Sequence, residues 1–215
     1  MSEKEPLFSS KNIKLLTEPI GTSNPITVQV LGICSALAVT VNLKPSIVMA
    51  ISVMVVLAAS NVVISLLRHY IPPRIRIIVQ LTVIATMVIL VDLFLKAFSP
   101  EVSKKLSVFV GLIITNCIIM GRLEAFALGN KPWPSFLDGI GNSAGYGMIL
   151  IIVAFFRELL GSGTLLGYEI IDMTGLYKIG YEDNGLMILP PMALIVVGII
   201  IWVQRSRNAD LIDIS

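Results

Sequence analysis

Charged residues divide this chain into long apolar stretches separated by short polar connectors. Three stretches lack charge over a length that crosses a bilayer, which takes about 20 predominantly apolar residues. They cover residues 19–43, 45–67 and 184–204. Three shorter uncharged stretches, each extended by apolar flanking residues, cover 77–91, 106–121 and 139–156. The pattern therefore predicts six transmembrane helices.

Composition supports the same class of protein. Hydrophobic residues make up 55% of the chain, charged residues only 14%, and the mean hydropathy is +0.88, which lies outside the usual soluble range. The connectors are too short for a separate soluble domain. The polar first 24 residues contain no apolar core of the kind that a signal peptide carries, so we expect no cleavage. A net charge of +2 without a basic, aromatic-rich stripe gives no indication of nucleic-acid binding.

Lysine and arginine are distributed unevenly between the two sides of the predicted bundle. One side of the bundle would hold both termini and the second and fourth loops between spans. Its basic residues are Lys4, Lys11, Lys14, Arg68, Arg74, Arg76, Lys131, Arg205 and Arg207. The opposite side holds fewer: Lys44, Lys96, Lys104, Lys105 and Lys178. Because positively charged loops are retained in the cytoplasm, we expect both termini to be cytoplasmic.

The two halves of the chain share a layout. Each half places one cysteine in its first span, Cys34 or Cys117, and follows it with a Lys-Pro turn, at 44–45 or 131–132. Three spans per half force the second copy to be inverted relative to the first, as in many transporters. We therefore expect an all-α membrane protein with a 3+3 inverted-topology repeat. Its parts are a polar N-terminal segment over 1–23, repeats over 24–98 and 104–204, and a C-terminal tail over 205–215.

The first and fourth spans carry residues that interrupt helices. Pro25 and Gly32 precede Cys34, and the fourth span contains Gly111 and Gly121 and meets charged residues soon afterwards. Backbone groups freed inside a membrane need protein or a polar ligand as partners. We predict that both helices are broken near mid-membrane, where the two cysteines would meet.

Several chemical roles are open to a pair of buried cysteines. Each thiol could simply be a small, buried, apolar side chain. A disulfide is disfavoured in a reducing compartment and in a bilayer core. A structural zinc site needs four Cys or His ligands, and the only histidine, His69, lies at a span end. An iron–sulfur cluster also takes four thiolates, so this chain could supply half of one.

Five segments resemble one family of membrane proteins. These are "LGICSALAVT" (31–40), "RIIVQLTVIA" (76–85), "VGLIITNCIIMGRLEAFA" (110–127), "PSFLDGIGNSAGYG" (134–147) and "FFRELLGSGTL" (155–165). They are similar to the D-subunit family of the bacterial Na+-translocating NADH:quinone oxidoreductase and to the related E subunits and Rnf-complex subunits. The resemblance runs over about 24–202. Rnf subunits typically have proline after the first cysteine, whereas Ser35 and Ala36 follow here, which favours the quinone-reductase family.

The resemblance implies a translocase subunit in the bacterial inner membrane that has no independent catalysis. It implies that Cys34 and Cys117 are iron ligands of a [2Fe-2S] cluster shared with an antiparallel E subunit, and that the cluster relays electrons across the membrane during Na+ export. NADH, FAD, FMN and quinone would then bind to other subunits, among A, B, C and F. The chain lacks a GxGxxG fingerprint and the threonine motif for covalent FMN, and "GSGTLLG" (161–167) has the wrong spacing for a dinucleotide site.

Acidic residues within or beside the spans are candidates for a sodium path, because burying a charge in a membrane is costly. We select Asp92 and Asp138 first, then Glu124 and Glu158. The alternative is that the two aspartates are interfacial and that the glutamates, with Arg122 and Arg157, form solvated or partnered span ends.

Other polar and small residues have two interpretations each. Ser35, Thr40 and Asn116 either donate hydrogen bonds to the sulfurs or close gaps in the broken helices. The small residues Gly141, Ser143, Gly145 and Gly147 favour close helix packing over ligand binding. Two other function classes stay open beside the electron relay: a small inverted-repeat ion carrier, and a purely structural assembly subunit.

Overall fold

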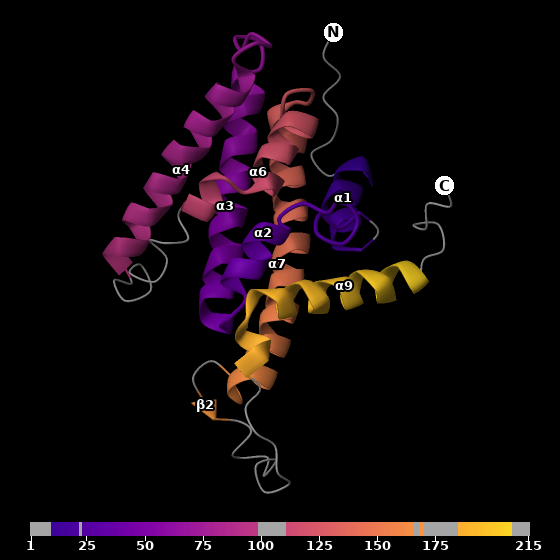
Figure 1. Cartoon of the computed structure of the whole chain (residues 1–215). Coiled ribbons are helices and arrows are strands. Elements are labelled where there is room, and N and C mark those ends of the chain that lie inside the picture. Colours follow the sequence, from indigo (N-terminus) through magenta and orange to yellow (C-terminus); the bar gives the residue numbers. More distant parts are fainter. Residues whose placement is uncertain (1–9, 22, 99–110, 166–167, 170–184, 208–215) are drawn as a thin grey trace, which may run out of the picture.

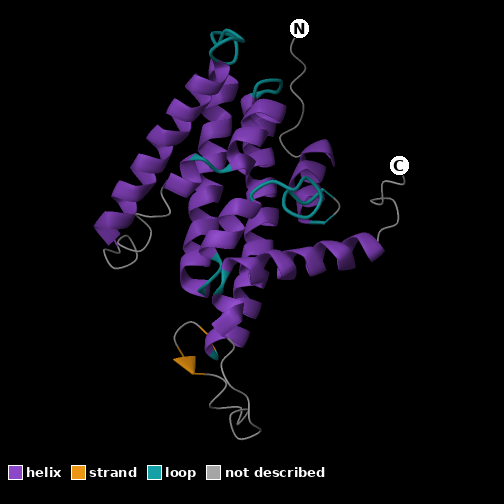
Figure 2. Ribbon diagram, in the orientation of Figure 1, coloured by secondary structure: helices purple, strands orange, loops and turns teal. Residues whose placement is uncertain are grey.

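The computed structural model describes residues 10–21, 23–98, 111–165, 168–169 and 185–207. The described helices are α1 (Ser10–Thr17), η1 (Glu18–Ile20), α2 (Ile33–Val39), α3 (Leu43–Leu67), α4 (Arg76–Phe98), α6 (Cys117–Arg122), η2 (Leu123–Ala127), α7 (Pro132–Ser162), η4 (Gly185–Ile188) and α9 (Pro190–Arg207). Two short strands, β1 (Thr164–Leu165) and β2 (Tyr168–Glu169), pair in antiparallel orientation after α7. Figures 1 and 2 show an elongated, almost entirely helical molecule.

Among the described residues, three helices are long and apolar enough to cross a membrane: α3, α4 and α7. They correspond to the second, third and fifth spans expected from the sequence. The expected first and fourth spans contain the short helices α2 and α6, and the expected sixth contains α9. The start of the expected fourth span and most of the 161–184 loop lie outside the described residues. An all-helical membrane fold is therefore confirmed, and the six-span repeat stays a prediction.

Helices α3 and α7 pack against each other in antiparallel orientation and form the centre of the molecule. Ala58 lies against Gly139, where an added Cβ would be 2.9 Å from the Ala58 Cα, and Ala50 lies against Gly147. The buried apolar core around them takes side chains from these two helices and from the segments packed on them, including α2, α4, α6 and η2. Small residues on both sides bring the helices close, as membrane helices require when no hydrophobic effect drives them together.

The N-terminal segment packs on a second glycine face of α7. A Cβ at Gly141 would lie 2.4 Å from the Leu15 carbonyl oxygen, and one at Gly145 would lie 2.3 Å from the Pro19 carbonyl oxygen. The Asn24 amide nitrogen also donates to the Gly145 carbonyl at 3.0 Å. The small residues of α7 therefore do serve packing, but half of them receive the chain's own N-terminal segment instead of a long helix.

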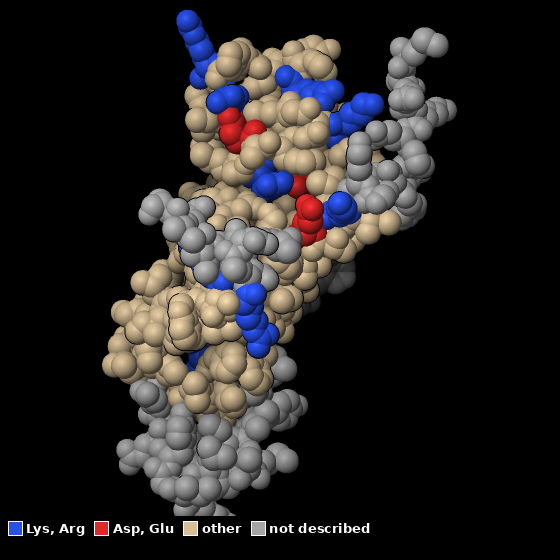
Figure 3. All heavy atoms as spheres, turned by 90° about the vertical axis from the view of Figure 1, so that its right-hand side faces the viewer, with Lys and Arg blue, Asp and Glu red and all other residues tan. Residues whose placement is uncertain are grey.

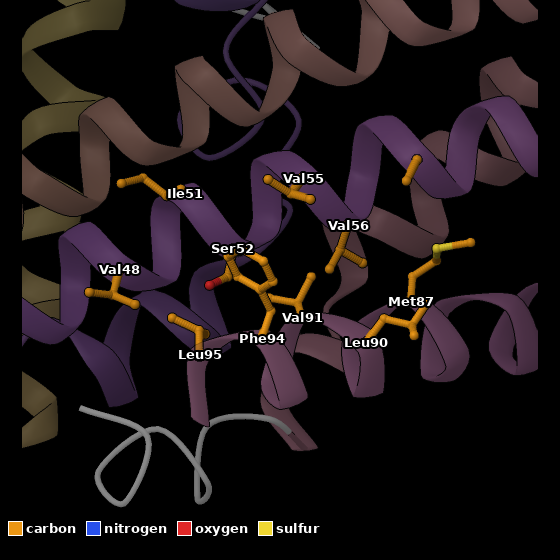
Figure 4. A pocket seen from close by; sticks show the side chains of 11 residues that line it. Val48, Ile51, Ser52, Val55, Val56, Met87, Leu90, Val91, Phe94 and Leu95 are labelled. Carbon is orange, nitrogen blue, oxygen red and sulfur yellow. The ribbon is translucent and has the colours of Figure 1, made fainter. Parts of the chain in front are cut away.

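Helix α4 is the most exposed of the long helices. Only 17% of its most apolar stretch is buried inside the molecule. An apolar groove of about 640 Å³ separates it from α3 and is lined by side chains such as Ile51, Val55, Leu90 and Phe94 (Figure 4). Among the residues that line it, Ser52 alone has a polar side chain. The groove thus resembles a lipid-facing surface more than a site for a polar ligand.

Helix α9 projects sideways from the α3–α7 pair (Figure 1). Ala193 and Val197 are its buried residues, and most of its other apolar side chains are exposed. Near its end, Gln204 donates to the Gly21 carbonyl at 2.9 Å. The face shown in Figure 3 is mostly uncharged, and its visible acidic side chains lie among basic ones in the upper half.

Candidate functional site

The two cysteines of the chain lie together. The Cys34 sulfur, in the first turn of α2, is 3.8 Å from the Cys117 sulfur, at the start of α6, although 83 residues separate them. Cys34 is exposed and Cys117 is half-buried. The contact predicted from the two interrupted spans is therefore present, and the pair is open on one side.

The start of α2 depends on an unusual backbone. Gly32 immediately precedes the helix with φ of 83°, in the left-handed region that favours glycine, and Val30 also has a positive φ of 58°. The chain reaches this turn through an irregular segment, in which the Leu31 amide donates to the Pro25 carbonyl at 2.8 Å. The turn aims the Gly32 N–H at the Cys117 sulfur, 3.1 Å away. The backbone at Gly32, which leads into the helix that carries Cys34, thus donates a hydrogen bond to Cys117.

Helix α6 begins after a break at Thr115–Asn116, because residues 111–114 are helical and Asn116 has an extended backbone with ψ of 118°. The Asn116 side chain caps the new helix by accepting from the Ile118 amide. Asn116 therefore closes a backbone gap, which is one of its two predicted roles.

A tyrosine that the sequence interpretation missed joins the two cysteine segments. Tyr146, in the middle of α7, is fully buried, and its hydroxyl lies 2.7 Å from Ser35 Oγ and 3.4 Å from Asn116 Nδ2. Ser35 and Asn116 are the chain neighbours of Cys34 and Cys117. The signal in the sequence was a tyrosine in the middle of an uncharged span, where a phenolic hydroxyl needs a partner.

The separation of the sulfurs excludes a disulfide and is compatible both with a thiol–thiol hydrogen bond and with two ligands of one metal ion. It is far longer than a disulfide bond of about 2.05 Å. Two thiolates bound at about 2.3 Å to one tetrahedral metal ion would stand about 3.8 Å apart, and the sulfurs here are 3.8 Å apart. The described residues contain no group of three or more His, Cys, Asp or Glu side chains that could hold a metal. The site fits two thiolate ligands of one metal, with further ligands required from outside the described residues.

The four candidate sodium-path acids lie in separate places, and each has a protein partner. Asp138 is buried, and its carboxylate accepts hydrogen bonds from Arg122 and from the Asn142 amide nitrogen. Glu124 binds Arg76 at 2.7 Å and Gln80 at 2.8 Å. Asp92 pairs with Lys96 at 2.6 Å, and Glu158 accepts from the Leu43 amide at 2.5 Å.

Two of these placements decide between alternatives that the sequence left open. Asp138 is inside the protein with only 1% of its surface exposed, so it is not interfacial within the described structure. Arg122 pairs with Asp138 of α7 and lies over the Phe126 ring, so it is not a solvated span end. These contacts hold α6 and η2 against α7.

Arg157 is also buried, and its acceptors are neutral. It donates to Thr40 Oγ1 at 2.6 Å and to the Leu37 carbonyl at 3.3 Å, both near the end of α2. Its other donors bind the carbonyls of Met187, Ile188 and Leu189. A buried charge needs such complete hydrogen bonding. Of the two alternatives, a solvated or a partnered span end, Arg157 is therefore the partnered one. Thr40 bonds to Arg157 and to the Ala36 carbonyl, so it closes backbone gaps.

The fold and the site define a membrane protein that holds a thiol pair between two short helices packed beside long apolar ones. A family model described as "Rnf-Nqr subunit, membrane protein" matches residues 12–201. The chain therefore belongs to the Rnf-Nqr family.

Curated relatives cover nearly the whole chain. The D subunit of the Na(+)-translocating NADH-quinone reductase of Psychromonas ingrahamii is 55% identical over 208 residues, which are 96% of this chain and 99% of that protein. The corresponding D subunit of Shewanella baltica is 51% identical over 212 residues, with the same coverage. That of Photobacterium profundum is 55% identical over 192 residues, 89% of this chain and 91% of that protein.

Proposed function

We propose that this chain is the D-type membrane subunit of a Na+-translocating NADH-quinone reductase and that Cys34 and Cys117 hold one side of a [2Fe-2S] cluster shared with a homologous E subunit. The observation that supports the cluster role is the 3.8 Å separation of the two sulfurs, which suits two thiolates on one tetrahedral iron. The D-subunit relatives support the assignment to the complex. Such a cluster supplies one-electron transfer when it is bound.

The residues of this chain would hold and orient the two thiolates. The Gly32 N–H donates to the Cys117 sulfur at 3.1 Å, which fixes the position of that sulfur relative to the start of α2. Cys34 is exposed, so a partner surface must complete the ligand set and exclude water. An antiparallel E subunit with its own two thiolates meets this requirement.

The proposal extends to the arrangement in the membrane. The irregular backbone before α2 and before α6 supports a 3+3 inverted repeat of six spans, because such repeats have interrupted helices at their centre. The excess of lysine and arginine in the terminal and even loops supports cytoplasmic termini in the bacterial inner membrane. The A, B, C and F subunits would bind NADH, FAD, FMN and quinone.

A direct role in sodium transport is also a proposal. Of the four candidate acids, Asp92 has a buried carboxylate oxygen, Oδ1, without a hydrogen-bond partner among the described residues. An oxygen of this kind is a ligand that a hard cation prefers. Asp92 also pairs with Lys96 through its other oxygen. In Asp138 and Glu124 both carboxylate oxygens contact protein donors, and Glu158 accepts from the Leu43 amide, so these three acids are less available to sodium.

The cluster role is tested by Cys34→Ser and Cys117→Ser in the assembled complex, with Ala38→Ser, on the exposed face of α2, as the matched control. Each cysteine variant should lose about two irons per complex and the cluster's EPR signal, while the flavins stay bound. The control should keep both. Unchanged iron in either cysteine variant would overturn the cluster role.

A further inference from the structure

Tyr146 touches three residues that flank the thiol pair. It is fully buried in the middle of α7, and its hydroxyl contacts Ser35 and Asn116. A Cβ added to Gly32 would lie 2.8 Å from Tyr146 Cε2, so the ring packs directly on the Gly32 backbone. One side chain therefore contacts the segments that carry both cysteines.

The hydrogen bonds among Ser35, Tyr146 and Asn116 are all made by one assignment of the two hydroxyl protons. The Ser35 hydroxyl donates to the Gly32 carbonyl at 2.8 Å, which uses its only proton. The Tyr146 hydroxyl must then donate to Ser35 Oγ at 2.7 Å, and the Asn116 amide nitrogen donates to the tyrosine oxygen at 3.4 Å. A series of hydrogen bonds thus runs from Asn116 through Tyr146 and Ser35 to Gly32, and each group donates to the next.

The two ends of this series of hydrogen bonds lie in the segments that carry the two cysteines. Asn116 precedes Cys117 and caps α6, while Gly32 begins α2 and donates its N–H to the Cys117 sulfur. On this buried side, the hydroxyl of Tyr146 is the group through which side-chain hydrogen bonds connect the cap of α6 to α2. The short helices have too few turns to hold their own positions.

We infer that Tyr146 is the positioning residue that sets the separation of the Cys34 and Cys117 sulfurs. It acts through Ser35 and Asn116, and it touches neither sulfur in the described contacts. The inference deepens the proposed function, since a fixed separation is what two ligands of one metal need. Its basis is the geometry of the free thiols, so it can be tested without iron.

The test uses phenylarsine oxide, which bridges two neighbouring thiols, and the full-length chain purified in detergent with its thiols reduced. Two As–S bonds form, the As=O bond breaks, and its oxygen leaves as water with the two thiol protons. No electrons are transferred. A pair held in place binds the arsenic more tightly than a pair that must first be ordered. The readout is the dissociation constant, with mass spectrometry to confirm one arsenic per chain.

Tyr146→Phe keeps the ring and removes the hydroxyl, so the fold should survive and the dissociation constant should rise about tenfold, the scale of one lost buried hydrogen bond. Ser35→Ala should have a similar effect, and the double variant should be little worse than either single variant. Tyr70→Phe, at an exposed tyrosine, is the matched control and should bind like wild type. Cys34→Ser should abolish bridging.

Unchanged affinity in Tyr146→Phe would overturn the inference, as would independent, multiplying effects of Tyr146→Phe and Ser35→Ala. Failure of the wild-type chain to bind one arsenic between its two cysteines would also overturn it. In the assembled complex, Tyr146→Phe should retain iron and shift the EPR signal or midpoint potential. If the cysteine variants keep their iron while Tyr146→Phe weakens arsenic binding, the cluster proposal fails and the positioning role stands.

Discussion

Arg157 of α7 donates a 2.6 Å hydrogen bond to the hydroxyl of Thr40, just beyond the last residue of α2. The same guanidinium binds the Ile188 carbonyl of η4 at 2.7 Å, so one side chain connects three elements. Thr40 and the Leu37 carbonyl, which also accepts from Arg157, lie at the end of α2 opposite to Cys34. Carbonyls at a helix C-terminus carry partial negative charge, which offsets the buried cation.

Arg157→Lys should destabilise the protein although it keeps the charge. An ammonium group cannot reach Thr40 and Ile188 in the fork geometry of a guanidinium. We expect a loss of about 2–3 kcal/mol in the free energy of unfolding, the range for hydrogen bonds to charged groups. SDS titration of the purified chain measures it. Arg205→Lys, at an exposed position of α9, should change stability little, and equal losses in both variants would contradict the bridging role.

The pair formed by Arg122 and Asp138 predicts non-additive effects. Asp138→Asn leaves the guanidinium of Arg122, whose side chain is 16% exposed, without its anion, and should cost about 3 kcal/mol. The double variant Arg122→Gln, Asp138→Asn removes both charges and should recover part of that loss. If the double variant is as unstable as the sum of the two single variants, the aspartate does not act through Arg122.

The ion pair between Arg76 and Glu124 should contribute less. Its side chains are 46% and 36% exposed, and partly exposed pairs contribute at most about 1 kcal/mol. We therefore expect Glu124→Gln to cost clearly less stability than Asp138→Asn under the same SDS titration. Gln80 can still hydrogen-bond a glutamine at this position. A larger loss in Glu124→Gln would indicate a role beyond this pair.

Gly141→Ala and Gly145→Ala should loosen the N-terminal segment from α7. A new Cβ would lie 2.4 Å and 2.3 Å, respectively, from backbone oxygens of that segment, so the segment must move. Overpacking of this kind costs about 1–3 kcal/mol. Limited proteolysis near Thr17 should become faster. Gly198→Ala, where an added Cβ meets nothing within 4 Å, is the control, and should if anything stabilise α9.

Gly32→Ala should disturb the thiol pair directly. A left-handed backbone costs a non-glycine residue about 1–2 kcal/mol, and the new Cβ would also be 2.8 Å from the Tyr146 ring. Under the proposed cluster role, the iron content of the assembled complex should fall. Gly111→Ala adds a Cβ in open space and should leave the iron unchanged. Full iron in Gly32→Ala would show that the positive φ is dispensable for the site.

The sequence predicted the position of the cysteine pair because its signals are local. Cys34 follows Pro25 and Gly32, Cys117 lies in a span that runs into charged residues, and such interruptions mark the centre of an inverted repeat. The long helices α3, α4 and α7 followed equally from uncharged length. Whether the two sulfurs are iron ligands stays a prediction.

The partners of Tyr146 and Arg157 depend on tertiary contacts that no periodicity encodes. The hydroxyl of Tyr146 bonds Ser35 across 111 residues, and Arg157 binds Thr40 across 117. An Arg-Glu dipeptide near the end of an apolar stretch resembles a membrane boundary, so the sequence left open whether Arg157 is solvated or partnered. Neutral acceptors at the end of α2 and in residues 187–189, which composition cannot reveal, stabilise it inside the protein.

The exposure of Cys34 has a consequence for biogenesis. A newly made chain presents a reduced dithiol at its surface before any partner covers it, and such a pair captures soft metal ions and oxidants readily. Assembly must therefore protect this surface as well as stabilise the fold. If another subunit covers this pair, as the proposed function requires, a cell that makes this chain in excess would accumulate exposed metal-binding thiols, and balanced synthesis of the two chains would prevent this.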